Sequence, residues 1–231
     1  MACLVWCLTL PARARRPLWR LLPRWSGGSE KCKLNWPSAL IQQGLIAILN
    51  RVNTATPILI LPGWQNSGPG HWQSLWQDQL GYMRVEQHDW LRPLRGDWIA
   101  RLEDVLLSLD APAVLVAHSL GCQLVAAWAA HSQNTGRVKA ALLVAPGDAE
   151  RDELRPVLGS WSPLVLKTLP FPSTLVASIN DPYCTLARAT QFADAWGSRL
   201  VNAGARGHIN ADSGLGDWPA GQALLQQQIQ I

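Results

Sequence analysis

Short apolar runs alternate with segments of helical spacing from residue 57 to the end of the chain, and this alternation limits the fold more than any other feature. Runs that are apolar on both faces are typical of parallel strands buried between helices. We expect strands at 58–62, 83–90, 113–119, 139–146, 173–181 and 198–204. We expect helices near 70–80, 97–109, 121–132, 185–196 and 217–229. The pattern predicts an α/β protein, a three-layer sandwich with a mostly parallel six-stranded sheet.

The first 51 residues differ in composition from the rest of the chain. They contain eight Lys or Arg and one acidic residue, whereas residues 52–231 contain twelve and fifteen. The net charge of +4 therefore comes from the N-terminal segment, and the remainder lacks the basic character that nucleic-acid binding requires. We expect residues 1–51 to be a poorly ordered extension and residues 52–231 to form the folded domain. The extension could be upstream sequence from a misassigned start, with the true start near Leu49 or Val52, or a leader such as a mitochondrial transit peptide.

Hydropathy and cysteine content exclude several other classes of protein. No stretch of 18 apolar residues occurs, so no membrane span is predicted. The five cysteines are odd in number and lack both a C-x-x-C pair and metal-ligand spacing. We therefore expect reduced thiols, a cytoplasmic protein, and neither a metal nor an organic cofactor. Cys122 and Cys184 are interpreted as small buried hydrophobic residues.

Ser119 ends the third apolar run and stands between small residues in the string AHSLG. Small residues two positions before and after a serine let a strand and a helix approach closely around a sharp turn. This is the pattern of a nucleophile elbow, with Ala117 in place of the usual first glycine. An N-cap serine would fit the short pattern too, but the apolar strand before it and the helical segment after it favour a nucleophile. In such a turn the backbone N–H of Leu120 faces a developing oxyanion.

The loop after the first run, GWQNSGPGHW, should supply the second oxyanion donor. Gly63 permits a tight turn there, and the backbone N–H of Trp64 is the expected donor by its position. Gly63, His71, Trp72 and Trp161 are the candidates for contact with substrate. Tryptophan in a chain this rich in it serves more often in packing than in binding, so a place in the core is the alternative for Trp64, Trp72 and Trp161.

A serine hydroxyl needs an imidazole to remove its proton and a carboxylate to orient that imidazole. Of the five histidines, His208 follows the last apolar run in a glycine-flanked loop and is the predicted base. His118 is disfavoured, because adjacent side chains of a strand point to opposite faces. Asp181, directly after the fifth run, is the preferred acid, and Asp148, after the fourth, is the second choice. The order Ser, Asp, His along the chain is that of α/β-hydrolases.

Five blocks of the sequence resemble, in the same order, the small lidless α/β-hydrolases named after a retinoblastoma-binding protein, a family that includes the bacterial YdeN-like serine hydrolases. The blocks are LPGWQNSGPGHWQSLW, VAHSLGC, LLVAPGD, ASINDPYC and GHINADSGLGDWPAG, and the resemblance covers roughly residues 56–230. It implies a triad of Ser119, His208 and Asp181 and the hydrolysis of small esters. It also implies a supporting position for the His71–Trp72 pair near the pocket mouth. The partner motif L-x-C-x-E is absent, so binding to a retinoblastoma-type partner is not expected.

The segment 147–172 has only 26 residues, too few for a large cap over the site. We therefore expect an open site suited to a small-molecule ester or acyl substrate. The predicted function is a serine hydrolase that cleaves small carboxylic esters through an acyl-enzyme intermediate. The alternatives are a thioesterase or amidase with the same triad, and a catalytically silent scaffold that binds a partner.

Overall fold

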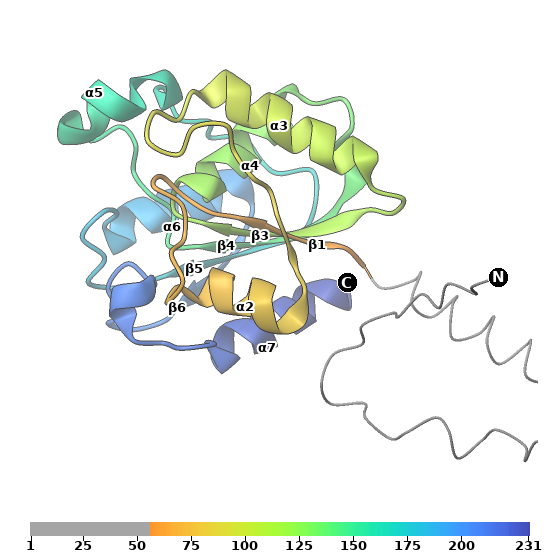
Figure 1. Ribbon diagram of the computed structural model, residues 1–231. Helices are drawn as coiled ribbons and strands as arrows, with labels where there is room; N and C mark the ends of the chain where they lie inside the picture. Colours follow the sequence, from red (N-terminus) through yellow and green to blue (C-terminus); the bar gives the residue numbers. More distant parts are fainter. Residues whose placement is uncertain (1–55) are drawn as a thin grey trace, which may run out of the picture. The chain divides into compact units, whose positions relative to one another are not determined.

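The strands of the chain form a twisted parallel sheet in the computed structural model, which describes residues 56–231 (Figure 1). The described part contains six strands in the spatial order β2-β1-β3-β4-β5-β6, and every neighbouring pair is parallel. Their bounds are β1 Ile58–Leu61, β2 Met83–Arg84, β3 Ala113–His118, β4 Val138–Val144, β5 Ser173–Ala177 and β6 Arg199–Asn202. The expected extension, residues 1–51, lies outside the described residues, as do residues 52–55 of the expected domain.

Helices cover both faces of this sheet. The α-helices of the described part are α2 Trp72–Leu80, α3 Arg95–Ser108, α4 Leu120–His131, α5 Arg155–Leu158, α6 Leu186–Trp196 and α7 Pro219–Ile229. Helices α3 and α4 lie on one side of the sheet, and α2 and α7 lie on the other (Figure 1). The predicted α/β sandwich with six strands is thereby confirmed, and it is the α/β-hydrolase fold.

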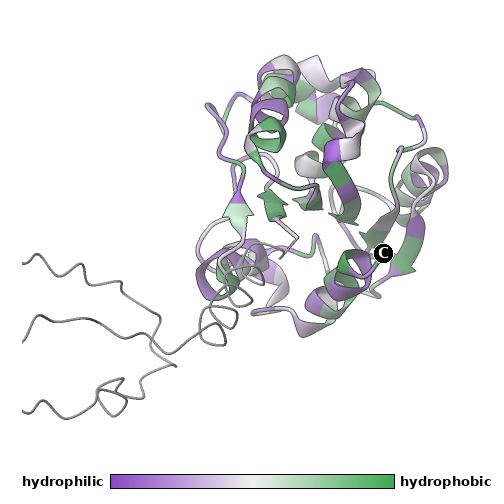
Figure 2. Ribbon diagram, turned by 90° about the vertical axis from the view of Figure 1, so that its right-hand side faces the viewer, coloured by the Kyte–Doolittle hydropathy of each residue, from purple (hydrophilic) through white to green (hydrophobic). Residues whose placement is uncertain are grey.

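The strands are apolar on both faces because each face packs into its own core. On one face, alternate strand residues such as Leu115 and Leu143 pack with α3, α4 and α6. On the other, Val116 and Leu142 pack with α2 and α7. Figure 2 shows the resulting pattern, with the strands in the hydrophobic colour and hydrophilic stretches on the helices around them. A single strand therefore contributes to two cores, which explains runs that are apolar at every position.

The strand expected at 83–90 is much shorter than predicted. Ladder pairing with β1 covers Met83 and Arg84, and the last contact is a hydrogen bond of 2.9 Å from the Val85 N–H to the carbonyl of Ile60. Beyond this point the carboxylate of Asp89 accepts hydrogen bonds from two following backbone N–H groups, at 2.8 and 2.9 Å, and turns the chain toward α3. The alternation of residue types in the sequence continues beyond Met83 and Arg84, although the ladder pairing does not, because β2 is an edge strand with only one neighbour.

The segment 147–172 holds no large cap, as the sequence predicted. It folds into the 3-10 helices η3 Asp152–Leu154 and η4 Gly159–Trp161 on either side of the four-residue helix α5. Cys122 and Cys184 are both buried, and neither forms a disulfide within residues 56–231. Among the helices of residues 56–231, none is long and apolar enough to cross a membrane.

Candidate active site

Ser119 occupies a sharp turn between β3 and α4. Its backbone has φ 53° and ψ −121°, a conformation with positive φ that is costly for a residue with a side chain. The turn is held by two hydrogen bonds: the Ser119 N–H donates to the carbonyl of Val144, and the Ser119 carbonyl accepts from the N–H of Cys122, each at 3.0 Å. The strand end and the helix start thus fix the position of the hydroxyl.

Glycines around the turn explain why small residues are needed there. A Cβ on Gly121 would lie 2.4 Å from the carbonyl oxygen of Leu61, so α4 could not pack this closely on β1 with any other residue. A Cβ on Gly63 would lie 2.7 Å from the Cβ of Ser119. The loop after β1 and the start of α4 therefore meet directly at the serine, and Gly63 serves this approach.

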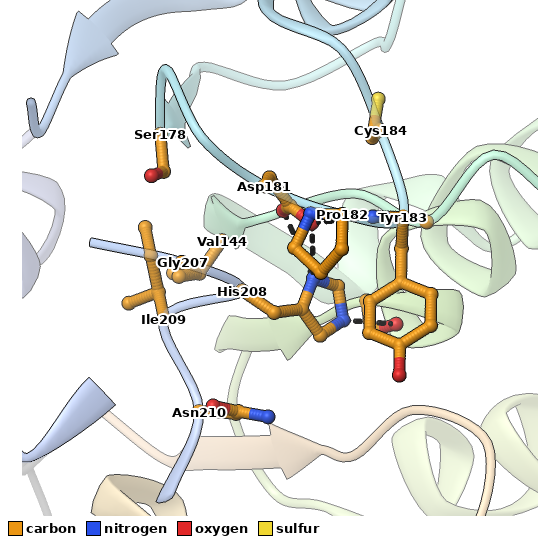
Figure 3. Close-up of polar contacts among 12 residues, drawn as sticks. Val144, Ser178, Asp181, Pro182, Tyr183, Cys184, Gly207, His208, Ile209 and Asn210 are labelled. Atoms are coloured by element: carbon orange, nitrogen blue, oxygen red, sulfur yellow. Dashed lines mark hydrogen bonds and ion pairs between the residues drawn. The ribbon is translucent and has the colours of Figure 1, made fainter. Parts of the chain in front are cut away.

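The three residues predicted as nucleophile, base and acid form one hydrogen-bonded chain, of which Figure 3 labels His208 and Asp181. The Nε2 atom of His208 lies 2.9 Å from the Oγ of Ser119. On the other side of the ring, Nδ1 lies 2.9 Å from both carboxylate oxygens of Asp181. A carboxylate only accepts, so the Nδ1 proton is donated to Asp181 and Nε2 is free to accept the serine proton.

Two loops at the carboxyl ends of β5 and β6 are hydrogen-bonded to each other and hold the acid and the base in place. The Oγ of Ser178 accepts from the Arg206 N–H at 2.9 Å, and the Oδ1 of Asn180 accepts from the Gly207 N–H at 2.8 Å. Ser178 also donates to Asn180 at 2.8 Å. Asp181 follows directly on the first loop, and His208 follows directly on the second. Sequence reasoning missed Ser178 and Asn180, although two polar residues just after a buried strand were a usable signal.

His118 contacts His208, the predicted base, but takes no part in the hydrogen bonds that join His208 to Ser119 and Asp181. Its Nε2 lies 2.9 Å from the backbone carbonyl of His208, and the two rings meet edge to face with centroids 4.8 Å apart. The carbonyl accepts, so His118 donates from Nε2. Burial lowers the pKa of His118 well below its ordinary value, with smaller contributions in the same direction from the neighbouring imidazoles of His71 and His208, so this ring is neutral. His118 is a positioning residue for the loop that carries His208.

The backbone N–H groups of Trp64 and Leu120 have the surroundings expected of oxyanion donors. Both residues line the cavity that contains Ser119. Neither N–H donates to an acceptor within the described part of the chain. A Cβ on Gly63 would lie 3.1 Å from the Leu120 nitrogen, which places the residue before Trp64 against the start of α4. The Leu120 N–H is also at a helix N-terminus, where negative charge is stabilised.

The cavity above Ser119 has a volume of about 320 Å³. Tyr183 lines the cavity, with its ring centroid 4.6 Å from that of His208. Figure 3 shows these two side chains next to each other. Leu154 and Leu158 contribute aliphatic lining from the segment 147–172. The space suits a small molecule rather than a long lipid chain.

Three of the four residues expected to contact substrate, Gly63, Trp72 and Trp161, are not among the residues that line the cavity. Gly63 instead lets the loop after β1 approach Ser119. Trp72 is 1% exposed and donates from Nε1 to the carbonyl of Ile209 at 2.8 Å, within the core under α2 and α7. Trp161 is equally buried and donates to the carbonyl of Pro93 at 2.9 Å. Both indoles fill the core, and neither is among the residues that line the cavity. Trp64 and His71, in contrast, do line it.

Asp148, the second choice for the acid, faces a different partner. Its Oδ2 lies 3.3 Å from the Nε of Arg188, which also pairs with Glu150. Asp148 therefore belongs to an ion-pair cluster beside the site. Among residues 56–231, no group of three or more His, Cys, Asp or Glu side chains is arranged to hold a metal ion.

Solved structures with this fold include hydrolases of bacterial origin. A YdeN-like hydrolase from Pectobacterium atrosepticum is 28% identical, with a TM-score of 0.69 over 81% of this chain and 97% of its own. The ydeN gene product of B. subtilis is 20% identical, with a TM-score of 0.63 over 76% and 100%. An esterase from Rhodococcus sp. is 14% identical, with a TM-score of 0.58 over 77% and 91%, and shares the fold. No curated protein sequence matches this chain. The family described as serine hydrolase matches residues 58–227, which include Ser119, Asp181 and His208, and the chain therefore belongs to the serine hydrolase family.

Proposed function

We propose that the protein cleaves small carboxylic esters through an acyl-enzyme intermediate, with Ser119 as nucleophile, His208 as general base and Asp181 as the acid that orients it. The observation that carries this proposal is the 2.9 Å contact between the Oγ of Ser119 and the Nε2 of His208, with Asp181 on the opposite ring nitrogen. A serine hydroxyl becomes nucleophilic at neutral pH when an oriented imidazole accepts its proton.

In the first half-reaction, the Oγ of Ser119 attacks the ester carbonyl carbon while its proton passes to the Nε2 of His208. The carbonyl oxygen becomes an oxyanion, which the N–H groups of Trp64 and Leu120 stabilise, each contributing about 3 kcal/mol to the barrier reduction. When the intermediate collapses, the bond from carbon to the alcohol oxygen breaks and His208 returns the proton to that oxygen. The products of this half-reaction are the free alcohol and an acyl group on Ser119.

In the second half-reaction, a water molecule attacks the acyl carbon and gives its proton to His208. Collapse of this second intermediate breaks the bond to the Oγ of Ser119, which recovers the proton from His208. Asp181 stays ionised throughout and stabilises the imidazolium that forms in each half-reaction. The same steps apply to a thioester or an amide, which differ only in the leaving atom.

Replacement of the nucleophile tests the proposal directly. Ser119→Ala should lower kcat for p-nitrophenyl butyrate on the order of 10⁶-fold, to what binding and the oxyanion donors alone provide. Ser108→Ala, at the end of helix α3 and away from the cavity, is the matched control and should keep full activity. Turnover by Ser119→Ala at the rate of the unmodified protein would contradict the assignment.

A fluorophosphonate probe and a substrate panel separate the remaining functions. An activated serine reacts covalently with the probe, so Ser119 should be labelled and the Ser119→Ala variant should not. An unlabelled protein with no turnover would favour the silent partner-binding scaffold. Comparing kcat/KM for matched esters, thioesters and amides then decides between an esterase and a thioesterase or amidase, and a higher value for thioesters or amides would overturn the ester assignment.

A further inference from the structure

His71 presents a buried hydrogen-bond donor that the proposed reaction does not use. The residue caps helix α2, where its Nδ1 accepts from the backbone N–H of Gln73 at 3.1 Å. An accepting nitrogen carries no proton, so the single proton of the neutral ring is on Nε2. His71 is 4% exposed, and its Nε2 has no hydrogen-bond partner among residues 56–231. A buried donor without an acceptor is destabilising, and such groups in native proteins call for a partner.

The ring of His71 is neutral at physiological pH. Burial is the main cause that lowers its pKa to about 3, and the neighbouring His208 and Arg84 side chains contribute less, in the same direction. Its ring lies edge to face against that of His118, with centroids 4.7 Å apart, and His118 is neutral as well. His71 therefore offers an uncharged N–H, which suits an uncharged oxygen acceptor.

The cavity that contains Ser119 also contains His71, and its lining is divided by chemistry. Amide side chains come from the loop after β1 and the loop after β6, namely Gln65, Asn66 and Asn210. Aliphatic side chains come from the segment 147–172, namely Ala149, Leu154 and Leu158. All of these groups are neutral, so the lining matches a neutral molecule with one apolar and one polar part.

We propose that His71 is a specificity-determining residue that donates its Nε2 proton to an uncharged oxygen of the substrate other than the scissile ester. This inference rests on the proposed function and narrows its substrate class to small neutral esters that carry an additional ether, hydroxyl or carbonyl oxygen. Such an oxygen gives the buried N–H its acceptor, whereas a methylene in the same place leaves it unpaired. A site built around a buried polar group discriminates strongly against analogues that lack the matching group.

Two pairs of esters of equal size, each differing by one oxygen in place of one methylene, measure this contact. The acyl pair is p-nitrophenyl methoxyacetate and p-nitrophenyl butyrate, and the alcohol pair is 2-methoxyethyl acetate and butyl acetate. For each pair the ratio of kcat/KM values is divided by the ratio of the hydroxide-catalysed rates, which removes the difference in intrinsic reactivity. We expect the unmodified protein to favour the oxygen-bearing ester in one pair by about fivefold to tenfold, as for one neutral hydrogen bond.

His71→Asn isolates the contact with substrate from the capping of α2. Asparagine is a good N-cap and can accept from the Gln73 N–H, but its side chain is shorter than histidine and does not place a donor where Nε2 lies. In His71→Asn the ratio of kcat/KM values within the pair, corrected for intrinsic reactivity, should fall toward one. His88→Asn, at an exposed histidine that does not line the cavity, is the matched control and should leave the ratio unchanged.

The outcomes separate this inference from the function on which it rests. Turnover of butyrate and butyl esters with no preference in either pair would overturn the role of His71 and leave the esterase intact. A preference that His71→Asn leaves unchanged would do the same. Turnover of none of the four esters would overturn both. If His71→Asn does not fold, the ratios of the unmodified protein still decide, since a value near one in both pairs contradicts the proposal.

Discussion

His208 is held from three directions, and each contact has a separate task. The carboxylate of Asp181 accepts a hydrogen bond from Nδ1, and the Oγ of Ser119 lies at hydrogen-bond distance from Nε2. The ring of His118 donates to the backbone carbonyl of His208. The first contact fixes which nitrogen carries the proton, and the third fixes where the backbone of the loop lies. The proposed base is therefore set in both its tautomer and its position before any substrate binds.

The choice between the two candidate acids gives a prediction at a single residue. Asp181→Asn replaces the acceptor at Nδ1 with an amide that can donate, which favours the wrong tautomer of His208 and should lower kcat on the order of 10⁴-fold. Asp148→Asn is the control, because Asp148 pairs with Arg188 rather than with the imidazole, and its effect on kcat should stay within a few-fold. Ester hydrolysis at saturating substrate measures both, and equal losses would contradict the assignment of the acid.

Single site residues were predictable from the sequence where a local pattern indicates their position. Ser119, Asp181 and His208 each come shortly after an apolar run, at the end of the parallel sheet where loops gather. Trp72 and Trp161 were misplaced because an indole has the same local pattern whether it fills a core or lines a cavity. The hydrogen bonds that Ser178 and Asn180 accept link residues 28 and 27 positions apart, so the polar residues after the strand mark a position in the sequence but do not identify the partner.

At the level of elements, the site depends on how closely the start of α4 approaches β1. The helix begins immediately after Ser119, and Gly121 in its first turn lies against the carbonyl oxygen of Leu61 at the end of β1. The strand and helix around Ser119 were predicted to within one residue, because long periodic segments carry a clear signal. Strand β2 was predicted too long, because an edge strand can keep its alternating sequence pattern after its pairing has ended.

The close approach of α4 to β1 predicts what a methyl group added at Gly121 would do. Gly121→Ala would put a Cβ 2.4 Å from a backbone oxygen that cannot rotate away, so α4 must shift from β1. We expect a loss of about 1–3 kcal/mol in the free energy of unfolding, together with a lower kcat because Ser119 moves with the helix. Gly136→Ala, where a Cβ would meet nothing within 4 Å, is the control. Denaturant unfolding and ester turnover give the two readouts, and unchanged values in Gly121→Ala would contradict this account.

For the molecule as a whole, the buried neutral histidines make stability depend on pH. The folded protein holds His71 with its pKa lowered to about 3 and His118 with its pKa lowered well below the ordinary value, chiefly through burial. The unfolded chain takes up these protons near pH 6.5, so acid favours unfolding. The stabilisation is therefore complete above about pH 6.5 and is lost as the pH falls below that value toward the lowered pKa.

Denaturant unfolding at pH 7.5 and pH 5.0 measures this dependence. Between these two conditions each of the two histidines should lower the free energy of unfolding by about 2 kcal/mol, since each pH unit below the pKa in the unfolded chain is worth about 1.4 kcal/mol. The loss in His71→Asn should be smaller than in the unmodified protein by about 2 kcal/mol, because one of the two groups is gone. Equal losses in the two proteins would show that His71 is not held neutral in the folded state.

The hydrogen bonds between the loops after β5 and β6 bear on how the site can move. Because Ser178 and Asn180 tie the two loops together, a displacement of either one carries Asp181 and His208 with it as one body. Ser119 stands on a different support, the junction of β3 and α4. His118, the last residue of β3, donates to the backbone carbonyl of His208 and joins the two supports, so the hydroxyl, the imidazole and the carboxylate are all held by one connected set of hydrogen bonds.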